Sequence, residues 1–221
     1  MSAPASQVLR LMLLLSPSFP VGGFAYSHGL EQAASDGQVR DAAALQEWLT
    51  SLLAQGSQWN DAVLFAEAHR RAAAGQALAE VAELAEALAG SKERHLEQQN
   101  LGRAFISAVK AGGLALPEGL GERAAYPVAV GAAAAVQGID AESALTAFLH
   151  AFASNQIQCA IRLGITGQAG GVRLLADLEA VLLETASKAA ASALDDLGSN
   201  TIAAEIASMK HETLHSRIFR T

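Results

Sequence analysis

Hydrophobic residues recur at the spacing of an α-helix along most of the chain. In residues 42–55, for example, Leu45, Leu49, Leu52 and Leu53 fall on one helical face. The same periodicity predicts further helices at residues 26–34, 61–74, 77–90, 92–111, 124–137, 141–163, 172–194 and 201–214. With a first helix near residues 8–15, the pattern predicts about nine or ten helices in a single all-α domain spanning residues 1–221.

Glycine and proline residues separate the expected helices. Residues 16–23 contain two prolines and two glycines, which predict that the first helix ends there. The loop of residues 112–119, GGLALPEG, is the clearest interior break, yet the composition is the same on both sides of it. We therefore expect one domain without a flexible linker.

The apolar segments are too short or too interrupted to cross a membrane. The run Leu11–Leu15 is shorter than the core of an export signal and directly follows Arg10, so it is expected to be a helix of the folded protein. The longest uncharged runs, residues 124–139 and 143–161, contain proline, glycine and polar residues and predict buried helices. No membrane association is expected.

Composition narrows the class of protein further. Hydrophobic residues make up 51% of the 221 positions and charged residues 17%, which predicts a folded chain. The formal charge of -7, with 15 Lys and Arg, argues against binding to nucleic acid. The single cysteine, Cys159, excludes an internal disulfide and a zinc site with several thiolates, as is usual in a reducing compartment. We therefore expect a cytoplasmic location.

One segment matches a metallopeptidase motif. The sequence from His211 to His215, with Glu212 as the potential general base, fits H-E-x-x-H. A catalytic zinc needs a third protein ligand, and residues 216–221 contain no Asp, Glu or His. A pair of solvated histidines at the end of a helix therefore fits better than a zinc peptidase. We assign no metal ligand and no catalytic residue.

Nucleotide binding has little support. None of the four lysines follows a glycine, so the chain lacks a P-loop, and no cofactor is expected. Residues 167–171, GQAGG, could form an anion site at a helix start, but a tight turn between helices is the better interpretation. Cys159 and most aromatic residues are expected to pack in the core, namely Trp48, Trp59, Phe105, Phe148 and Phe152.

Two segments are more elaborate than a helical fold requires. Residues 18–31 combine proline, glycine, aromatic, hydroxyl and carboxylate groups in one turn that leads into a helix. Residues 208–221, which we call the tail, combine Met209, Ile218 and Phe219 with three basic residues. Terminal residues usually fray, so this composition predicts that the tail docks either on its own domain or on a partner.

The chain resembles the UreF family of urease accessory proteins over essentially its whole length. Four blocks in the same order carry the resemblance: Ser16 or Ser18 with Phe19, Pro20, Gly22, Gly23, Tyr26, Ser27, Gly29, Leu30 and Glu31; Tyr126, Pro127 and Val128 with Gly131; residues 160–164 with Gly167, Gln168 and Gly171; and residues 206–212 with residues 216–221.

The resemblance implies an all-α, dimeric, cytoplasmic chaperone without a reaction of its own. Such a protein binds UreD, also called UreH, and with it recruits the GTPase UreG to urease apoprotein for GTP-dependent nickel delivery. Activation of GTP hydrolysis in UreG, with an arginine finger from Arg162, Arg217 or Arg220, remains an alternative.

The same resemblance, taken with the residues above, implies a set of partner-binding positions. We expect the tail to be mobile in the free protein and ordered in a complex, with Phe219 in an apolar pocket and Arg217 in charge-assisted hydrogen bonds. Tyr26 could face a partner or pack in the core. The candidate partner-binding residues are Tyr26, Ser27, Glu31, Arg162, Gln168, His211, Glu212, Arg217, Phe219 and Arg220.

Overall fold

The computed structural model describes residues 5–23 and 25–221, so Phe24 of the expected turn lies outside it. The described residues form helices and no strand, which confirms the all-α class. In chain order the helices are α1 (Ala5–Leu14), α2 (Leu30–Ser35), α3 (Ala42–Gln55), α4 (Ser57–Ala73), α5 (Ala79–Ala87), α6 (Lys92–Ala111), α7 (Tyr126–Val136), α8 (Ala141–Arg162), α9 (Gln168–Asp177), α10 (Glu179–Ala191), the 3-10 helix η1 (Leu194–Asp196) and α11 (Ile202–His211).

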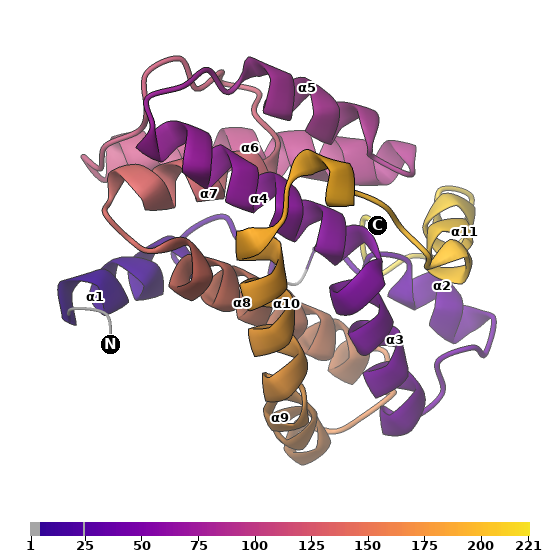
Figure 1. Ribbon diagram of the computed structural model, residues 1–221. Coiled ribbons are helices and arrows are strands. Elements are labelled where there is room, and N and C mark those ends of the chain that lie inside the picture. Colours follow the sequence, from indigo (N-terminus) through magenta and orange to yellow (C-terminus); the bar gives the residue numbers. More distant parts are fainter. Residues whose placement is uncertain (1–4, 24) are drawn as a thin grey trace.

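Helix α4 forms the centre of the domain. It packs along α7 and also contacts α3, α8 and α10 (Figure 1). The two helices approach closely at Gly131 of α7, where a Cβ atom would lie 2.4 Å from the carbonyl oxygen of Phe65. Only glycine fits there, and alanines on both sides of it are fully buried. The small side chains of α7 thus allow tight helix packing in the core.

The expected core residues occupy the core. Phe105, Phe148 and Phe152 are buried, as is Cys159, whereas Trp48 and Trp59 are partly buried against the core. Burial raises the pKa of the Cys159 thiol to about 12, because a thiolate is poorly solvated in apolar surroundings. These predictions are confirmed.

The prediction of one continuous helix over residues 172–194 is wrong. The segment forms two helices, α9 and α10, which meet at Leu178. The N–H of Leu178 donates to the carbonyl oxygen of Leu174, and its own carbonyl accepts from Leu182. Because the buried Leu178 side chain belongs to the apolar pattern of both helices, periodicity continues through the break.

Several helix boundaries also differ from the prediction. Helix α4 begins four residues earlier than expected, and α2 begins at Leu30, after the turn. Helix α9 begins at Gln168, so the glycines of residues 167–171 lie largely within a helix. At Gly171 a Cβ atom would lie 2.8 Å from Ile157 Cγ2, so this glycine allows α9 to approach α8.

Helix α1 contacts the domain through Leu11 and Leu14 and through two polar side chains. Gln7 and Arg10 donate to the carbonyl oxygens of Gly138 (2.5 Å) and Gln137 (2.6 Å) after α7. On its other face the apolar residues Val8, Leu9, Met12 and Leu13 are exposed. Among the helices of the described chain, none combines the length and the hydrophobicity needed to cross a membrane.

Two elements that are far apart in sequence lie together at one side of the domain. Figure 1 shows α11 beside α2, with the end of the tail close to both and α1 at the opposite side. Gly29 permits this contact, because its backbone has a φ of +79° and a Cβ atom would lie 2.9 Å from the Ser208 nitrogen. The two unusually composed segments of the sequence therefore meet.

Candidate functional site

The end of the tail pairs with the turn before α2. The backbone N–H of Ser27 donates to the backbone oxygen of Thr221 (2.8 Å), and the N–H of Arg220 donates to the carbonyl oxygen of Ala25 (2.8 Å). The Ser27 hydroxyl, which is fully buried, donates to the same Thr221 oxygen. These bonds hold the last residues of the tail against the turn.

Glu31 of α2 anchors the tail through its side chain. One carboxylate oxygen accepts from the N–H of Ile218 (2.7 Å), and the other accepts from the N–H of Phe219 (2.9 Å). The second oxygen also lies 3.1 Å from Nε2 of His211. A carboxylate that is 6% exposed is costly to bury without partners, so these donors make its position possible.

His211, the last residue of α11, connects α2 with α6. Its Nδ1 lies 2.7 Å from a carboxylate oxygen of Glu93, so both ring nitrogens face carboxylates. The ring is 0% exposed. Arg217 donates to the other oxygen of Glu93 (2.5 Å). Glu31, His211, Glu93 and Arg217 thus form one chain of charged groups between the tail and the domain.

Phe219 packs inside the domain. Its side chain is 4% exposed and belongs to the hydrophobic core, and the guanidinium of Arg162 lies 4.7 Å from the ring centroid. A cation over an aromatic face is attracted to the ring's electron density. Phe219 was expected to fill an apolar pocket, and in the structure that pocket is formed by its own chain. A role for Phe219 in binding a partner stays a prediction.

A buried charged cluster lies beneath the end of the tail. Glu97 of α6 is paired with Nε2 of His28 (3.0 Å) and with Arg94 (2.9 Å), and Arg94 also pairs with Asp61 of α4. Burial disfavours the charged form of Glu97, but His28 and Arg94 outweigh it and hold the pKa of Glu97 below its ordinary value. The hydroxyl of Thr221 donates to Glu97 (3.4 Å), which links the tail to this cluster.

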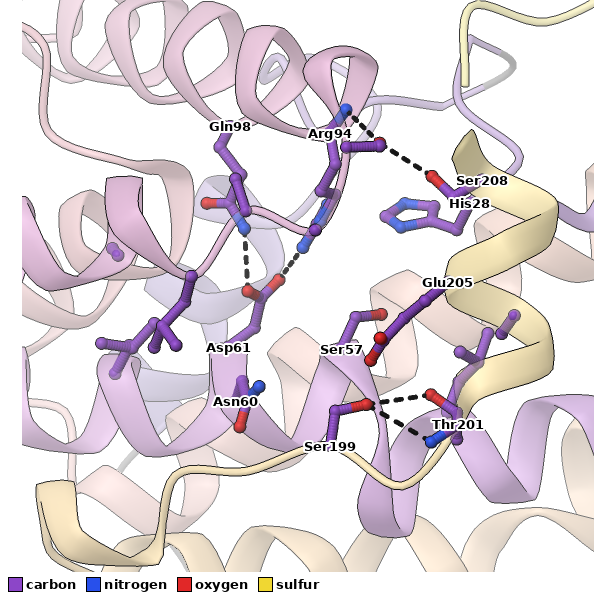
Figure 2. A pocket seen from close by; sticks show the side chains of 18 residues that line it. His28, Ser57, Asn60, Asp61, Arg94, Gln98, Ser199, Thr201, Glu205 and Ser208 are labelled. Atoms are coloured by element: carbon purple, nitrogen blue, oxygen red, sulfur yellow. Dashed lines mark hydrogen bonds and ion pairs between the residues drawn. The ribbon is translucent and has the colours of Figure 1, made fainter. Parts of the chain in front are cut away.

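A cavity of about 70 Å³, lined by both apolar and polar side chains, lies between α11, α4 and α6. Figure 2 shows Glu205 and Ser208 extending from α11 toward Ser57, Asp61 and Arg94 on the opposite side. Two residues that line it, His28 and Gln98, each have one buried side-chain atom without a hydrogen-bond partner among the described residues, namely Nδ1 of His28 and Oε1 of Gln98. The cavity is large enough for water, and Ser57, Asp61 and Ser208 are polar groups in its lining.

The structure brings together most of the predicted site residues. The turn and tail contribute Tyr26, Ser27, Glu31, His211, Arg217, Phe219 and Arg220, and α8 contributes Arg162. Tyr26 is buried, and burial raises its pKa, with Glu97 reinforcing and Arg220 opposing the rise. Tyr26 is thus buried in the free chain, and its role in binding a partner stays a prediction.

Two predicted residues lie outside this group. The carboxylate of Glu212 accepts from the N–H of Lys92 (2.9 Å) and so satisfies a free donor at the start of α6. Gln168 is exposed at the start of α9, and no hydrogen bond or ring contact of the described residues joins it to the tail. Their proposed roles in partner binding remain untested.

The peptidase motif does not form a metal site. Helix α11 ends at His211, whereas the motif needs both histidines on one helical face, so His215 lies beyond the helix and is exposed. Both nitrogens of His211 already contact carboxylates. The helix predicted for residues 201–214 is therefore too long at its end.

Sequence reasoning missed the residues that receive the tail. Glu93 and Glu97 are one turn apart on α6 and face the tail, with Arg94 between them. The available signal was the polar first half of α6, whose buried apolar residues Phe105, Ile106 and Val109 all lie in its second half. A helix half that is polar yet buried needs charged partners from elsewhere in the fold.

These features define an all-α protein whose distinguishing site is a peptide segment docked onto a helical body. The UreF family model matches residues 39–179. The chain is 55% identical to "Urease accessory protein UreF" of Rhizobium leguminosarum bv. viciae over 214 residues, covering 97% of this chain and 96% of the relative. It is also 55% identical over 218 residues to "Urease accessory protein UreF 1" of Brucella canis, covering 99% and 96%. The chain belongs to the UreF family of urease accessory proteins.

Proposed function

We propose that this protein acts in nickel insertion into urease, as an adaptor that binds UreD (UreH) and with it recruits the GTPase UreG to urease apoprotein. Membership of the family supports a role in urease maturation. The observation that carries the adaptor role is an exposed apolar stripe on α11, next to the docked tail. We expect this activity in the cytoplasm.

The stripe consists of residues one helical turn apart. Ile202, Ile206 and Met209 are 65%, 43% and 47% exposed and share one face of α11, while Ile218 in the tail is 52% exposed. Exposed apolar side chains that cluster on one element are typical of protein interaction sites. We assign the stripe of Ile202, Ile206, Met209 and Ile218 as the surface for UreD.

The docked tail contributes Ile218 to this surface. Because Phe219 points inward and its N–H is held by Glu31, the neighbouring Ile218 points outward. Arg217 and Lys210 follow or precede the stripe residues Ile218 and Met209 in the sequence and stay partly exposed, although they pair with Glu93 and Asp36. Apolar residues at the centre and basic residues at the rim form a common pattern in interfaces.

The protein is also expected to form a homodimer. A groove of about 1020 Å³ between α8, α9 and α10 is lined by apolar and polar residues, including Val172 (63% exposed) and Leu183 (49% exposed). A second chain that covered this groove would remove both side chains from water. We propose this groove as the surface between the two chains.

Co-purification tests the adaptor proposal. The tagged chain is expected to capture UreD, and UreG only when UreD is present. Met209→Glu combined with Ile206→Glu should abolish capture, because two charges would be buried in an apolar interface. Leu9→Glu, at an exposed residue of α1 (67% exposed), is the matched control and should leave capture intact.

Deleting residues 216–221 is a second test of the same surface. The deletion should abolish capture of UreD while circular dichroism shows an unchanged helical content, since no helix includes these residues. Intact capture by both the double variant and the truncated chain would refute the assignment of the stripe and the tail.

A further inference from the structure

We propose that helix α1 of one copy of this chain places its exposed apolar face in the groove between α8, α9 and α10 of a second copy, so that two such contacts join the two chains. This inference rests on the homodimer proposed above and deepens it, because it names the segment of the partner that would fill the groove.

Helix α1 has an apolar face that its own chain leaves uncovered. Leu11 and Leu14 pack against the domain, and Gln7 and Arg10 hold the helix to the segment after α7. The opposite face, which we call the ridge, consists of Val8, Leu9, Met12 and Leu13, which are 43% to 67% exposed. Because the contacts on the other side fix the helix, the ridge points away from its own domain.

The groove has the concave shape and the apolar lining that such a ridge requires. Its volume is about 1020 Å³, and its apolar lining residues are Ala147, Val172, Leu175, Ala176, Leu182 and Leu183. The lining begins at Asp140, two residues after Gly138, whose carbonyl oxygen accepts from Gln7 of α1. Figure 1 accordingly shows α1 next to the start of α8, which forms one wall of the groove.

This arrangement allows a closed dimer. Each chain carries one ridge and one groove on neighbouring parts of its surface. A two-fold axis that places α1 of one chain in the partner's groove also places the partner's α1 in the first groove. The two contacts are then identical, and no ridge or groove is left over for a third chain.

The charges of the two surfaces are opposite. Arg10 is the single charged residue of α1, and it donates to a neutral carbonyl oxygen and has no ion pair among the described residues. Three carboxylates line the groove, again without an ion pair in the described part of the chain: Asp140, Glu142 and Glu179. Two grooves facing each other would repel, and so would two α1 helices. Charge therefore favours α1 as the occupant of the groove.

The exposed apolar area is of the size that a dimer needs. The four ridge residues, together with Val172 and Leu183 of the groove, expose on the order of 500–600 Å² per chain, whereas a stable interface buries about 800 Å² per partner. Monomeric proteins rarely leave so much apolar surface in contact with water. The polar groups at the edge of the groove would supply much of the remaining area.

Light scattering of the full-length chain tests the contact. The wild type is expected at about twice the mass of one chain. Leu9→Glu should shift it toward one chain, because a carboxylate would enter an apolar groove with an acidic edge. Met12→Glu should have the same effect, whereas Leu96→Glu, at an exposed residue of α6, should remain a dimer. Circular dichroism reports that each variant keeps its helices.

A mixture of two defective chains tests which surfaces meet. Leu183→Lys places a cation in the groove and should also give single chains. In a mixed dimer of Leu9→Glu and Leu183→Lys chains, one contact has the wild-type residues on both sides, and the other brings a carboxylate and an ammonium group together. The mixture should therefore recover the mass of a dimer, although neither variant does so alone.

Three outcomes would overturn the inference. A dimer that survives Leu9→Glu and Met12→Glu would place α1 outside the interface. Failure of the mixed chains to recover a dimer would mean that α1 does not enter the partner's groove. A monomeric wild type would refute the homodimer as well. Capture of UreD, measured on the same variants, reports the adaptor role separately, because we assign that role to α11 and the tail.

Discussion

The backbone N–H and the side-chain hydroxyl of Ser27 both donate to the backbone oxygen of Thr221, although 194 positions separate the two residues. Ser27 is buried in the turn before α2, and Thr221 is the last residue of the tail. Through these two hydrogen bonds the turn binds the end of the tail. Changes in this turn should therefore disturb the packing of α11 and the tail.

Gly29 gives a direct test of this relationship. We expect Gly29→Ala to destabilise the protein by about 2–4 kcal/mol, from strain at positive φ and from collision with the backbone of α11. Gly113→Ala is the control, because Gly113 also has positive φ (67°) but a Cβ atom added there would have no other atom within 4 Å among the described residues. It should cost only about 1–2 kcal/mol.

Urea denaturation of both glycine variants measures the difference. Hydrogen exchange should locate the excess loss for Gly29→Ala in α11 and the tail. Equal costs for the two substitutions would show that close contact between α2 and α11 does not contribute to stability.

Arg94 neutralises buried carboxylates, so its loss should be severe and dependent on pH. Arg94→Met should lower the free energy of unfolding by about 3–5 kcal/mol at neutral pH, because Asp61 loses its ion-pair partner in a buried site and Glu97 keeps only His28. Arg103→Met, at an exposed position on the same helix, should cost less than about 0.5 kcal/mol.

The effect of acid on the wild type follows from the lowered pKa of Glu97. Its ionisation stabilises the fold at pH values above its ordinary pKa of 4.5, and this contribution is lost as pH falls through the lower folded-state pKa. In Arg94→Met the carboxyls should protonate more readily, so the difference from the wild type should shrink in acid. Urea denaturation of the wild type and of Arg94→Met at neutral and at acidic pH measures this difference in the free energy of unfolding. A difference that is larger in acid would contradict the prediction.

Cys159 should be unreactive in the folded protein. With a pKa of about 12 caused mainly by burial, the thiolate fraction at about pH 8 is on the order of one in ten thousand. A disulfide reagent such as DTNB should label the native chain very slowly and the denatured chain at once. Fast labelling of the native chain would mean that α8 opens readily around this residue.

Leu183 should be important for dimer formation. Light scattering of the wild type is expected to give about twice the mass of one chain, and Leu183→Glu should shift it toward one chain by placing a charge in the groove. Leu96→Glu is the control, since Leu96 has a similar exposure of 46% on α6. A dimer that survives Leu183→Glu would assign the contact to another surface.

The sequence alone determined the local features of the protein. Helical periodicity, the glycine-rich breaks and the small residues of α7 were enough to predict the all-α class and the burial of Phe105 and Cys159. The blocks shared with the family were sufficient to identify it. These features depend on residues within a few positions of one another, so they leave a pattern in the sequence.

Only the tertiary structure decided how the tail is used. The sequence left self-docking and partner docking open, and the structure places Phe219 in the chain's own core and Glu31 beneath the tail. The contacts of His211 with Glu31 and Glu93 connect residues more than 100 positions apart. The sequence does not show whether a charged side chain is exposed to solvent or buried in an ion pair. The distinction arises only when folding brings an opposite charge and hydrogen-bond donors within reach.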